Sequence, residues 1–493
     1  MQQAVLEQLS REELISKLID YSFQLETLKE ELSQIKRLVF GSKSERFVPA
    51  ASPEQLSLGL AIEGSIVEVK TEKVEYTRTK AAKQNNHKGR LPLPAHLPRI
   101  EHIIEPEEST AGMKKIGEEI TETLDYIPGK LQVKKYIRPK YVKPQGEGIV
   151  IGTLPSRLIE KGIAEASLLA FLLTSKYVDH LPLHRQIEML KRLGVTLPAS
   201  TVSDWVSGSL KAITPLYECL VEKVKSSGYL QADETPLPVL DKDKKGNTHR
   251  GYYWVYHAVR ESLIFFDYRE GRSKEGPTEI LKNHRGYLQT DGYGAYDEFG
   301  LREGITLVHC MAHARRYFEK ASANHKEAAE YALKEIQQLY EIERRCRDGC
   351  IMGEERKQIR QEEAVPILKY LQAWMVEQYP KVNPTSSLGQ ALSYSLKRWK
   401  GLSHYVENGD LEIDNNLVEN AIRPVAIGRK NYLFAGSHEA AQRSAMMYSL
   451  FACCKKNEVN PHEWLIDVLN RISDHPINRM DDLLPNNWKI SRM

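Results

Sequence analysis

Apolar residues near the start of the chain follow a seven-residue repeat. They are separated by alternating steps of four and three, at Leu14, Leu18, Tyr21, Leu25, Leu28, Leu32, Ile35 and Val39. This spacing predicts a helix that pairs with a second copy as a coiled coil, assigned to residues 1–45. The alternative is an amphipathic helix that packs on its own chain. The repeat stops after Gly41, and residues 46–98, which carry a basic run from Lys70 to Arg90, are predicted to form a flexible linker.

Short extended runs on both sides of the turn dipeptide Pro128-Gly129 predict a small β unit over residues 99–150. Between Lys130 and Lys143, six residues are basic and none is acidic. On a strand, that alternation gives one cationic face suited to DNA phosphates. The candidate DNA contacts in this run are Lys134, Lys135, Arg138 and Lys140. An ordinary solvated strand face is the alternative.

Helical periodicity returns in residues 151–224, where two short helices are predicted around a glycine turn. The first ends near Leu193, Gly194 supplies the turn, and the second spans Ala199–Leu210 with Val202, Trp205 and Val206 on one face. This order is typical of a helix-turn-helix, with Ser200 and Thr201 at the end that would face the DNA groove. Such helix pairs are also common as plain packing units, so the DNA-binding interpretation depends on the following domain.

Residues 225–322 alternate between strands and turns, which predicts an α/β core. The strands expected are Gly228–Ala232, Tyr252–Ala258, Leu263–Tyr268, Gly286–Thr290 and Ile305–His309, followed by the helix Ala312–Ala321. The first strand runs into Asp233 and the fourth ends at Asp291. This order is that of an RNase H-like fold, in which two strand-end carboxylates and one from a later helix converge on a pair of metal ions.

The third carboxylate is predicted to be Glu419, on a helix in residues 413–437. Asp414 is expected to cap this helix and Pro424 to end it. Residues 323–412 show helical periodicity, for example at Leu388, Leu392 and Leu396, and are predicted to form a helical segment between the two parts of the core. Residues 438–493 are predicted to form a C-terminal helical region. The predicted fold is therefore a multidomain α/β protein. Its RNase H-like catalytic core carries a helical insertion and follows the coiled coil, the β unit and the helix-turn-helix.

Three carboxylates suit phosphodiester cleavage. Two Mg²⁺ ions neutralise charge on the attacking and the leaving oxygens, and Mg²⁺ prefers hard oxygen ligands. We therefore expect Asp233, Asp291 and Glu419 to be both the catalytic and the metal-binding residues, with two Mg²⁺ ions for which Mn²⁺ can substitute. A single Asp-Gly or Glu is usually a turn or surface residue, and it is their order along the chain that makes these three a set.

Composition narrows the classes of protein. The formal net charge of +3 gives no overall sign of a nucleic-acid partner, so any basic surface must be local. Six scattered cysteines without a CxxC pair argue against a disulfide framework and a zinc ribbon. With no apolar leader and no run of about 18 apolar residues, the expectation is a protein of the cytoplasm that is not associated with a membrane.

Several ordered strings resemble the DDE transposases of the insertion sequence 66 family over nearly the whole length. They are residues 232–236 (ADETP), 290–293 (TDGY), 309–316 (HCMAHARR), 414–424 (DNNLVENAIRP), 428–431 (GRKN), 434–437 (FAGS) and 483–488 (LLPNNW). The resemblance implies an RNase H-like catalytic domain with Asp233, Asp291 and Glu419 as its metal-binding triad. It also implies a helical insertion before the glutamate, which here leaves 127 residues between Asp291 and Glu419.

One departure from the family concerns zinc. Relatives commonly carry a cysteine-rich zinc-binding segment, but the corresponding stretch here, Glu105–Lys115, has no cysteine. His309, Cys310 and His313 form another possible cluster, yet tetrahedral zinc takes four ligands and no fourth stands out. Zinc is therefore not expected. Further candidate phosphate contacts are Arg315, Arg316, Arg423, Arg429 and Lys430, each of which can also be an ordinary surface charge.

The function favoured by the sequence is a transposase that binds the ends of an insertion sequence and catalyses metal-dependent DNA cleavage and strand transfer. Its expected partners are the terminal inverted repeats, target DNA, further copies of itself on DNA, and small accessory proteins of the element. Two alternatives stay open. One is a catalytically inactive or domesticated DNA-binding regulator, and the other is an RNase H-like nuclease that cuts without joining.

Overall fold

The computed structural model describes most of the chain from residue 157 onward and short stretches before it. The described residues are Tyr21, Gln24, Leu28, Gly129, 131–138, 140–142, 149–151, 157–159, 162–240 and 247–491. The chain divides into two units, one formed by Met1–Ser42 with Lys140–Met493 and the other by Lys43–Pro139. All helices and strands named below belong to the first unit.

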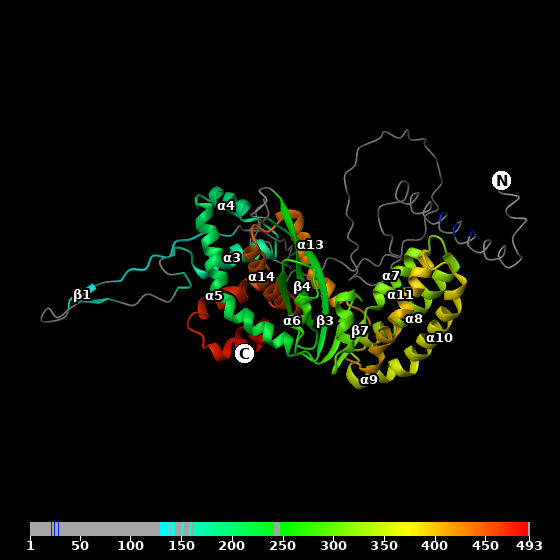
Figure 1. Ribbon diagram of the computed structural model, residues 1–493. Helices are drawn as coiled ribbons and strands as arrows, with labels where there is room; N and C mark the ends of the chain where they lie inside the picture. Colours follow the sequence, from blue (N-terminus) through cyan, green and yellow to red (C-terminus); the bar gives the residue numbers. More distant parts are fainter. Residues whose placement is uncertain are drawn as a thin grey trace, which may run out of the picture. The chain divides into compact units, whose positions relative to one another are not determined.

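A mixed five-stranded sheet lies at the centre of the larger unit (Figure 1). Its order is β5-β4-β3-β6-β7, and the strands are β3 (Tyr229–Leu240), β4 (Thr248–Ala258), β5 (Leu263–Arg269), β6 (Gly286–Thr290) and β7 (Ile305–His309). The first three strands pair antiparallel, whereas β6 pairs parallel with both β3 and β7. Most of β4 is buried, which explains its aromatic run from Tyr252 to Tyr256.

Helices α5 (Ala199–Lys225) and α14 (His438–Lys456) pack against the sheet at β5. Four more helices pack on these two and on one another: α3 (Ala166–Tyr177), α4 (Leu183–Arg192), α15 (Pro461–Arg471) and α16 (Pro485–Ser491). Helix α14 packs along the edge strand β5, where its Ser449 hydroxyl accepts the Phe266 N–H at 2.8 Å and its Cys453 sulfur accepts the Ile264 N–H at 3.1 Å. The edge strand thus finds partners in helix side chains instead of a further strand.

A second group of helices packs at the β7 side (Figure 1). They are α7 (Met311–Ala321), α8 (Lys326–Asp348), α9 (Gly353–Ile359), α10 (Val365–Gln378), α11 (Ser387–Lys397) and α12 (Trp399–Ser403), with a π-helical turn at Arg360–Ala364. Helices α8–α12 form their own hydrophobic core together with α7. The predicted helical insertion is therefore built mainly of helices, which are joined by loops such as residues 382–386 and 408–412. Among the described helices, none combines the length and the apolar character needed to cross a membrane.

Three more helical elements lie outside these two groups. Helix α6 (Glu275–Ile280) and the 3₁₀ helix η1 (Gly294–Leu301) flank β6, and α13 (Asn416–Tyr432) follows the insertion. Further 3₁₀ turns lie at Tyr379–Lys381, His404–Glu407 and Ile477–Leu483.

The predicted coiled coil and linker fall almost entirely outside the described residues. Of the eight positions in the apolar repeat, only Tyr21 and Leu28 are described, and both are helical and more than half exposed. The pairing of two chains through this helix stays a prediction.

The strand predicted over the basic run is mostly wrong. Residues 131–138 have no regular secondary structure, and only β1 (Lys140–Val142) pairs, antiparallel, with β2 (Ile149–Ile151). The sequence offers two reasons: Pro139 has no N–H for a ladder, and Val133 and Ile137 are left exposed instead of facing a core. The four candidate DNA contacts, Lys134, Lys135, Arg138 and Lys140, all lie at the surface.

The predicted pair of helices is present as α4 and α5. Gly194 takes a positive φ of 85° in the turn between them, as the sequence suggested. The prediction that Val202, Trp205 and Val206 share a buried face is confirmed, and Ser200 is exposed near the start of α5. The second helix is longer than expected because it continues to Lys225 through Pro215.

Candidate active site

Asp233 lies on the central strand β3, just beyond the point where β3 stops pairing with β6. The parallel ladder between β3 and β6 ends at the pair Gln231–Gln289. Strand β3 continues to Leu240, paired with β4 and, near its end, with Ala435 through a single parallel bridge at Val239. The prediction that the strand ends before Asp233 is therefore wrong, because the antiparallel hairpin extends it. The carboxylate nevertheless stands just beyond the end of the parallel ladder, where the sheet opens.

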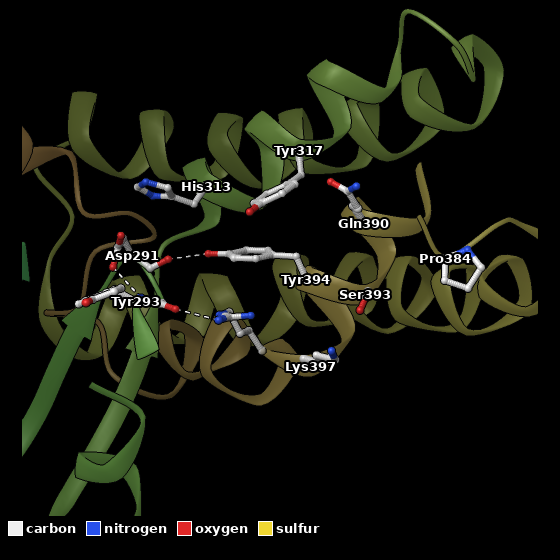
Figure 2. Close-up of a pocket in the computed structure, with 11 residues that line it drawn as sticks. Asp291, Tyr293, His313, Tyr317, Pro384, Gln390, Ser393, Tyr394 and Lys397 are labelled. Atoms are coloured by element: carbon white, nitrogen blue, oxygen red, sulfur yellow. Dashed lines mark hydrogen bonds between the residues drawn. The ribbon is translucent and has the colours of Figure 1, made fainter. Parts of the chain in front are cut away.

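Asp291 directly follows β6, as the sequence predicted. Its side chain accepts the N–H of Tyr293 at 2.8 Å, and its backbone carbonyl accepts a hydrogen bond from the hydroxyl of Tyr394 on α11 at 2.6 Å (Figure 2). The next residue, Gly292, has a φ of 86°, and its carbonyl accepts a bond from Arg398 at 2.8 Å. A Cβ at Gly292 would clash with the Arg398 side chain, so both conformation and space require glycine there.

Glu419 occupies the first turn of α13, on the chain that returns from the helical insertion. The helix does not end at Pro424 as predicted but continues to Tyr432. Proline removes one hydrogen bond from the helix, and tertiary contacts hold the second half. Val425 is buried, and Arg429 donates a hydrogen bond to the carbonyl of Pro236 on β3.

Two adjoining clefts contain the three carboxylates. Asp233 and Glu419 line a cleft of about 290 Å³, and Asp291 lines one of about 480 Å³ that runs along α7 and α11. His313 of α7 lines both clefts, so they meet at its side chain. Figure 2 shows His313 in the cleft of Asp291. The structure thus brings the three predicted residues to one edge of the sheet, from β3, from the end of β6 and from the start of α13.

Negative charge is concentrated around Asp233. Burial, together with the nearby carboxylates of Glu234, Asp291 and Glu419, raises the pKa of Asp233 well above its ordinary value. Burial also raises the pKa of Glu234, although a hydrogen bond from Arg272 opposes that rise. A cluster of this kind repels itself and gains from a bound cation.

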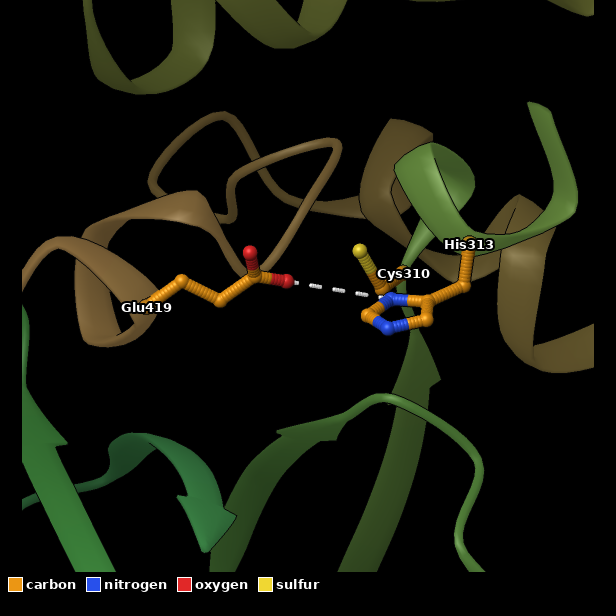
Figure 3. A group of neighbouring side chains, drawn as sticks. All are labelled: Cys310, His313 and Glu419. Carbon is orange, nitrogen blue, oxygen red and sulfur yellow. Dashed lines mark ion pairs between the residues drawn. The ribbon is translucent and has the colours of Figure 1, made fainter. Parts of the chain in front are cut away.

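Cys310, His313 and Glu419 form a second grouping, with one ligand atom of each lying within 4.8 Å of the others (Figure 3). The Nδ1 atom of His313 lies 3.9 Å from a carboxylate oxygen of Glu419. The Cys310 sulfur is fully buried and accepts the N–H of Asn415 at 3.2 Å, and burial raises the pKa of its thiol. A metal binds the thiolate, whose formation this environment opposes. His309, which the sequence suggested as part of the same cluster, is not a member of this group.

The predicted phosphate contacts fall into two sets. Arg316 and Arg423 line the cleft of Asp233 and Glu419, which suits them to an anionic substrate. The other three do not line either cleft: Arg315 pairs with Glu319 at 2.5 Å, Arg429 holds the Pro236 carbonyl, and Lys430 is exposed farther along α13.

Sequence reasoning missed several residues at the site. Arg272 pairs with Glu234 and lies 3.9 Å over the ring of Tyr293. Tyr394 and Arg398 hold the Asp291–Gly292 turn from the insertion, more than 100 residues away. Helical periodicity placed such residues on a helix but carried no information on what the helix contacts.

Comparison with known proteins identifies the family. Residues 161–443 match the description "Transposase IS66 family", and residues 449–486 match "IS66 C-terminal element". Residues 27–101 match "Transposase C of IS166 homeodomain", and residues 108–142 match "zinc-finger binding domain of transposase IS66". Residues 108–142 contain neither cysteine nor histidine, so this chain lacks the usual zinc ligands in that segment.

Three relatives from Sinorhizobium fredii (strain NBRC 101917 / NGR234) are similar over almost their full length. Uncharacterized protein y4jD is 31% identical, over 94% of this chain and 95% of its own length. Uncharacterized protein y4hP is 29% identical, over 94% and 88%, and uncharacterized protein y4qI is 33% identical, over 93% and 88%.

Proposed function

Because the chain belongs to the IS66 transposase family, we propose that it binds the ends of an insertion sequence and catalyses metal-dependent DNA cleavage and strand transfer. The observation that carries this proposal is the meeting of Asp233, Asp291 and Glu419 at the sheet edge where the parallel ladder of β3 and β6 ends. The strand order β5-β4-β3-β6-β7, with three antiparallel strands before two parallel ones, is that expected of an RNase H-like core.

The donor set fits Mg²⁺. Three carboxylates gather where burial and mutual repulsion favour a cation, and Mg²⁺ takes oxygen ligands and keeps several waters. When bound, two Mg²⁺ ions, or Mn²⁺ in their place, supply charge stabilisation on the attacking and the leaving oxygens of the phosphodiester. Asp233, Asp291 and Glu419 would hold them.

The other residues orient the DNA. Arg316 and Arg423, on the wall of the same cleft, grip the phosphate next to the scissile bond, since arginine binds phosphate through two hydrogen bonds. The α4–α5 pair reads base edges through Ser200 and Thr201, and the exposed basic residues of 134–140 contact phosphates. The DNA partners proposed are the terminal inverted repeats of the element and the target DNA.

The proposal also includes the domain division given by the sequence. Residues 225–322 and 413–437 form the catalytic core, with 323–412 inserted into it, and the segments before residue 225 bind DNA and pair chains. Joining two ends requires more than one active site, so we propose an oligomer on DNA, in the bacterial cytoplasm near the nucleoid. Small accessory proteins of the element would assist it.

An in vitro strand-transfer assay with the element's ends and Mg²⁺ tests the function. We expect nicked and joined products from the wild type. Asp233→Asn, Asp291→Asn and Glu419→Gln should each reduce them by at least about a thousandfold while end binding persists. Asp482→Asn, which removes a carboxylate paired with Arg479 near the C-terminus, is the matched control and should keep full activity.

The same assay separates the alternatives. Cleavage without joining would indicate a nuclease, and specific end binding without cleavage would indicate a regulator. Either result would overturn the transposase proposal.

A further inference from the structure

Three polar side chains lie fully buried beneath the carboxylates. They are Tyr229 and Gln231 on β3 and Gln289 on β6, each with 0% of its surface exposed. We call them the glutamine clasp. Gln231 and Gln289 stand opposite each other in the parallel ladder. Each comes two residues before a carboxylate of the site, in Leu230-Gln231-Ala232-Asp233 and Leu288-Gln289-Thr290-Asp291.

The clasp joins the two strands to each other. The Tyr229 hydroxyl donates to the side-chain oxygen of Gln289 at 2.5 Å, and the Gln231 amide donates to the same oxygen at 2.9 Å. Buried polar groups cost free energy unless they are paired, so this network is stable only when its remaining donors and acceptors also find partners.

Those partners all lie on the chain that leads to Glu419. The Gln289 amide donates to the Glu412 carbonyl at 2.8 Å, and the Tyr229 hydroxyl accepts the Glu412 N–H at 3.0 Å. Gln231 donates to the Asp414 carbonyl at 3.0 Å and accepts the Val418 N–H at 3.3 Å. Val418 is in the first turn of α13, whose N–H groups have no partner within the helix. The clasp therefore ties the start of the Glu419 helix directly to the strands of both aspartates.

Such a tie answers a geometric problem. Because 127 residues separate Asp291 from Glu419, the local chain cannot fix the spacing of their carboxylates. We infer that Tyr229, Gln231 and Gln289 are positioning residues that set Glu419 against Asp233 and Asp291 for binding divalent cations. The inference rests on the proposed function, since it assigns a role toward the metal site proposed above. Residues that orient metal ligands contribute roughly 10- to 100-fold in metal affinity.

Direct binding of Mn²⁺, followed by electron paramagnetic resonance of the free ion without DNA, tests this role. Gln231→Met and Gln289→Met keep the side-chain volume but lose the hydrogen bonds, and Tyr229→Phe removes one hydroxyl. We expect Mn²⁺ affinity to fall about tenfold or more in each glutamine variant, and less in Tyr229→Phe. The Mg²⁺ concentration for half-maximal cleavage should rise by a similar factor.

Asn457→Asp is the matched control. The Asn457 amide also holds two backbone carbonyls, those of Ser262 and Cys453, both at 2.9 Å, but it lies after α14 and lines neither cleft. This variant should lose thermal stability and keep wild-type Mn²⁺ affinity. If the clasp variants fold and bind Mn²⁺ as the wild type does, the clasp is only structural and the inference is overturned.

Two further outcomes are distinguishable. If the glutamine variants fail to fold, Tyr229→Phe decides, and wild-type Mn²⁺ affinity in that variant would overturn the inference. Asp233→Asn separates failure of the clasp from failure of the function. If wild-type Mn²⁺ binding does not depend on Asp233, the proposed metal site is wrong and the inference falls with it. If it does depend on Asp233 but not on the clasp, only the inference fails.

Discussion

The sheet region and the helical insertion stabilise their cores by different means. The core around the sheet is built from aromatic strands and the helices that cover them. The ring of Tyr253 makes edge contacts with those of Phe266 and Tyr448, which pack against each other at a tilt. The core of the insertion packs mainly small and aliphatic residues, with a few aromatic ones such as Phe318, Trp399 and Tyr405. It also encloses charge, because Glu343 and Arg360 are fully buried.

The buried charges of the insertion form one network. Glu343 accepts bonds from Arg360 at 2.8 and 2.7 Å and also pairs with Arg356. Burial alone would raise the pKa of Glu343, but the bonds and charges of the two arginines bring it below its ordinary value. Arg360 also donates to the carbonyls of Asn408 and Leu411.

This comparison shows that the sheet region and the insertion together fix the position of Glu419. Arg360 holds residues 408–411 from the insertion, and the glutamine clasp holds residues 412–418 from the sheet. Both act on the segment that precedes Glu419, so its position depends on the two regions together. Asp233 belongs to the sheet alone, whereas the turn of Asp291 is also held by the insertion through Tyr394 and Arg398.

Breaking the charge network should have the largest effect on stability. Arg360→Met leaves the buried carboxylate of Glu343 with one arginine partner, and the methionine fills the space so that water does not replace the lost one. We therefore expect the free energy of unfolding to fall by about 3–5 kcal/mol. Urea denaturation measures it. The control is Arg345→Met, whose pair with Glu363 lies at the surface and should contribute less than about 1 kcal/mol. Equal losses in both variants would show that the network does not hold the insertion.

Removing the contact between the insertion and Asp291 should affect activity more than stability. Tyr394→Phe loses the bond to the Asp291 carbonyl but keeps the ring, which stacks on Tyr317 at 4.5 Å. We expect cleavage to fall about tenfold, as for residues that orient metal ligands, with a stability loss of about 1 kcal/mol. Tyr370→Phe, on an exposed residue of α10, is the control for losing a hydroxyl. Wild-type cleavage by Tyr394→Phe would mean that the sheet alone positions Asp291.

The smallest effect is expected at Arg272, which belongs to the sheet side. Burial raises the pKa of Glu234 and Arg272 opposes the rise, so Arg272→Gln should raise that pKa further. The folded variant then holds the proton more tightly than the unfolded chain does. Its deficit in melting temperature should therefore grow as the pH rises above the ordinary value of 4.5 and shrink as the pH falls.

Arg443→Gln is the matched control for this pH dependence. Arg443 pairs with Glu439 at 3.7 Å on the surface of α14. The melting temperature of the Arg443→Gln variant should differ from that of the wild type by the same small amount at each pH. A deficit at Arg272→Gln that did not change with pH would mean that Arg272 does not influence the charge of Glu234.

Local patterns predicted local structure well. The helix face of Val202, Trp205 and Val206, the strand before Asp291 and the helical insertion all follow from periodicity, because each depends on residues a few positions apart. The same reasoning failed at two places. At Pro424, tertiary contacts keep the helix going beyond the proline, and at residues 131–138 the part of the chain that the structure describes offers no neighbouring strand or core to hold the predicted strand. The shared Leu-Gln-x-Asp pattern was a signal in the sequence that could have indicated the clasp.

The sequence by itself indicated which residues are candidates for the chemistry, because a carboxylate after an apolar run and one at a helix start are visible in their order. Only the tertiary structure decided how those carboxylates meet. The spacing of Glu419 from the aspartates, the hold of Tyr394 on Asp291 and the burial that raises the pKa of Asp233 all arise from residues far apart in the chain. Periodicity reports the neighbours of a residue along one element, whereas these properties depend on which elements pack together.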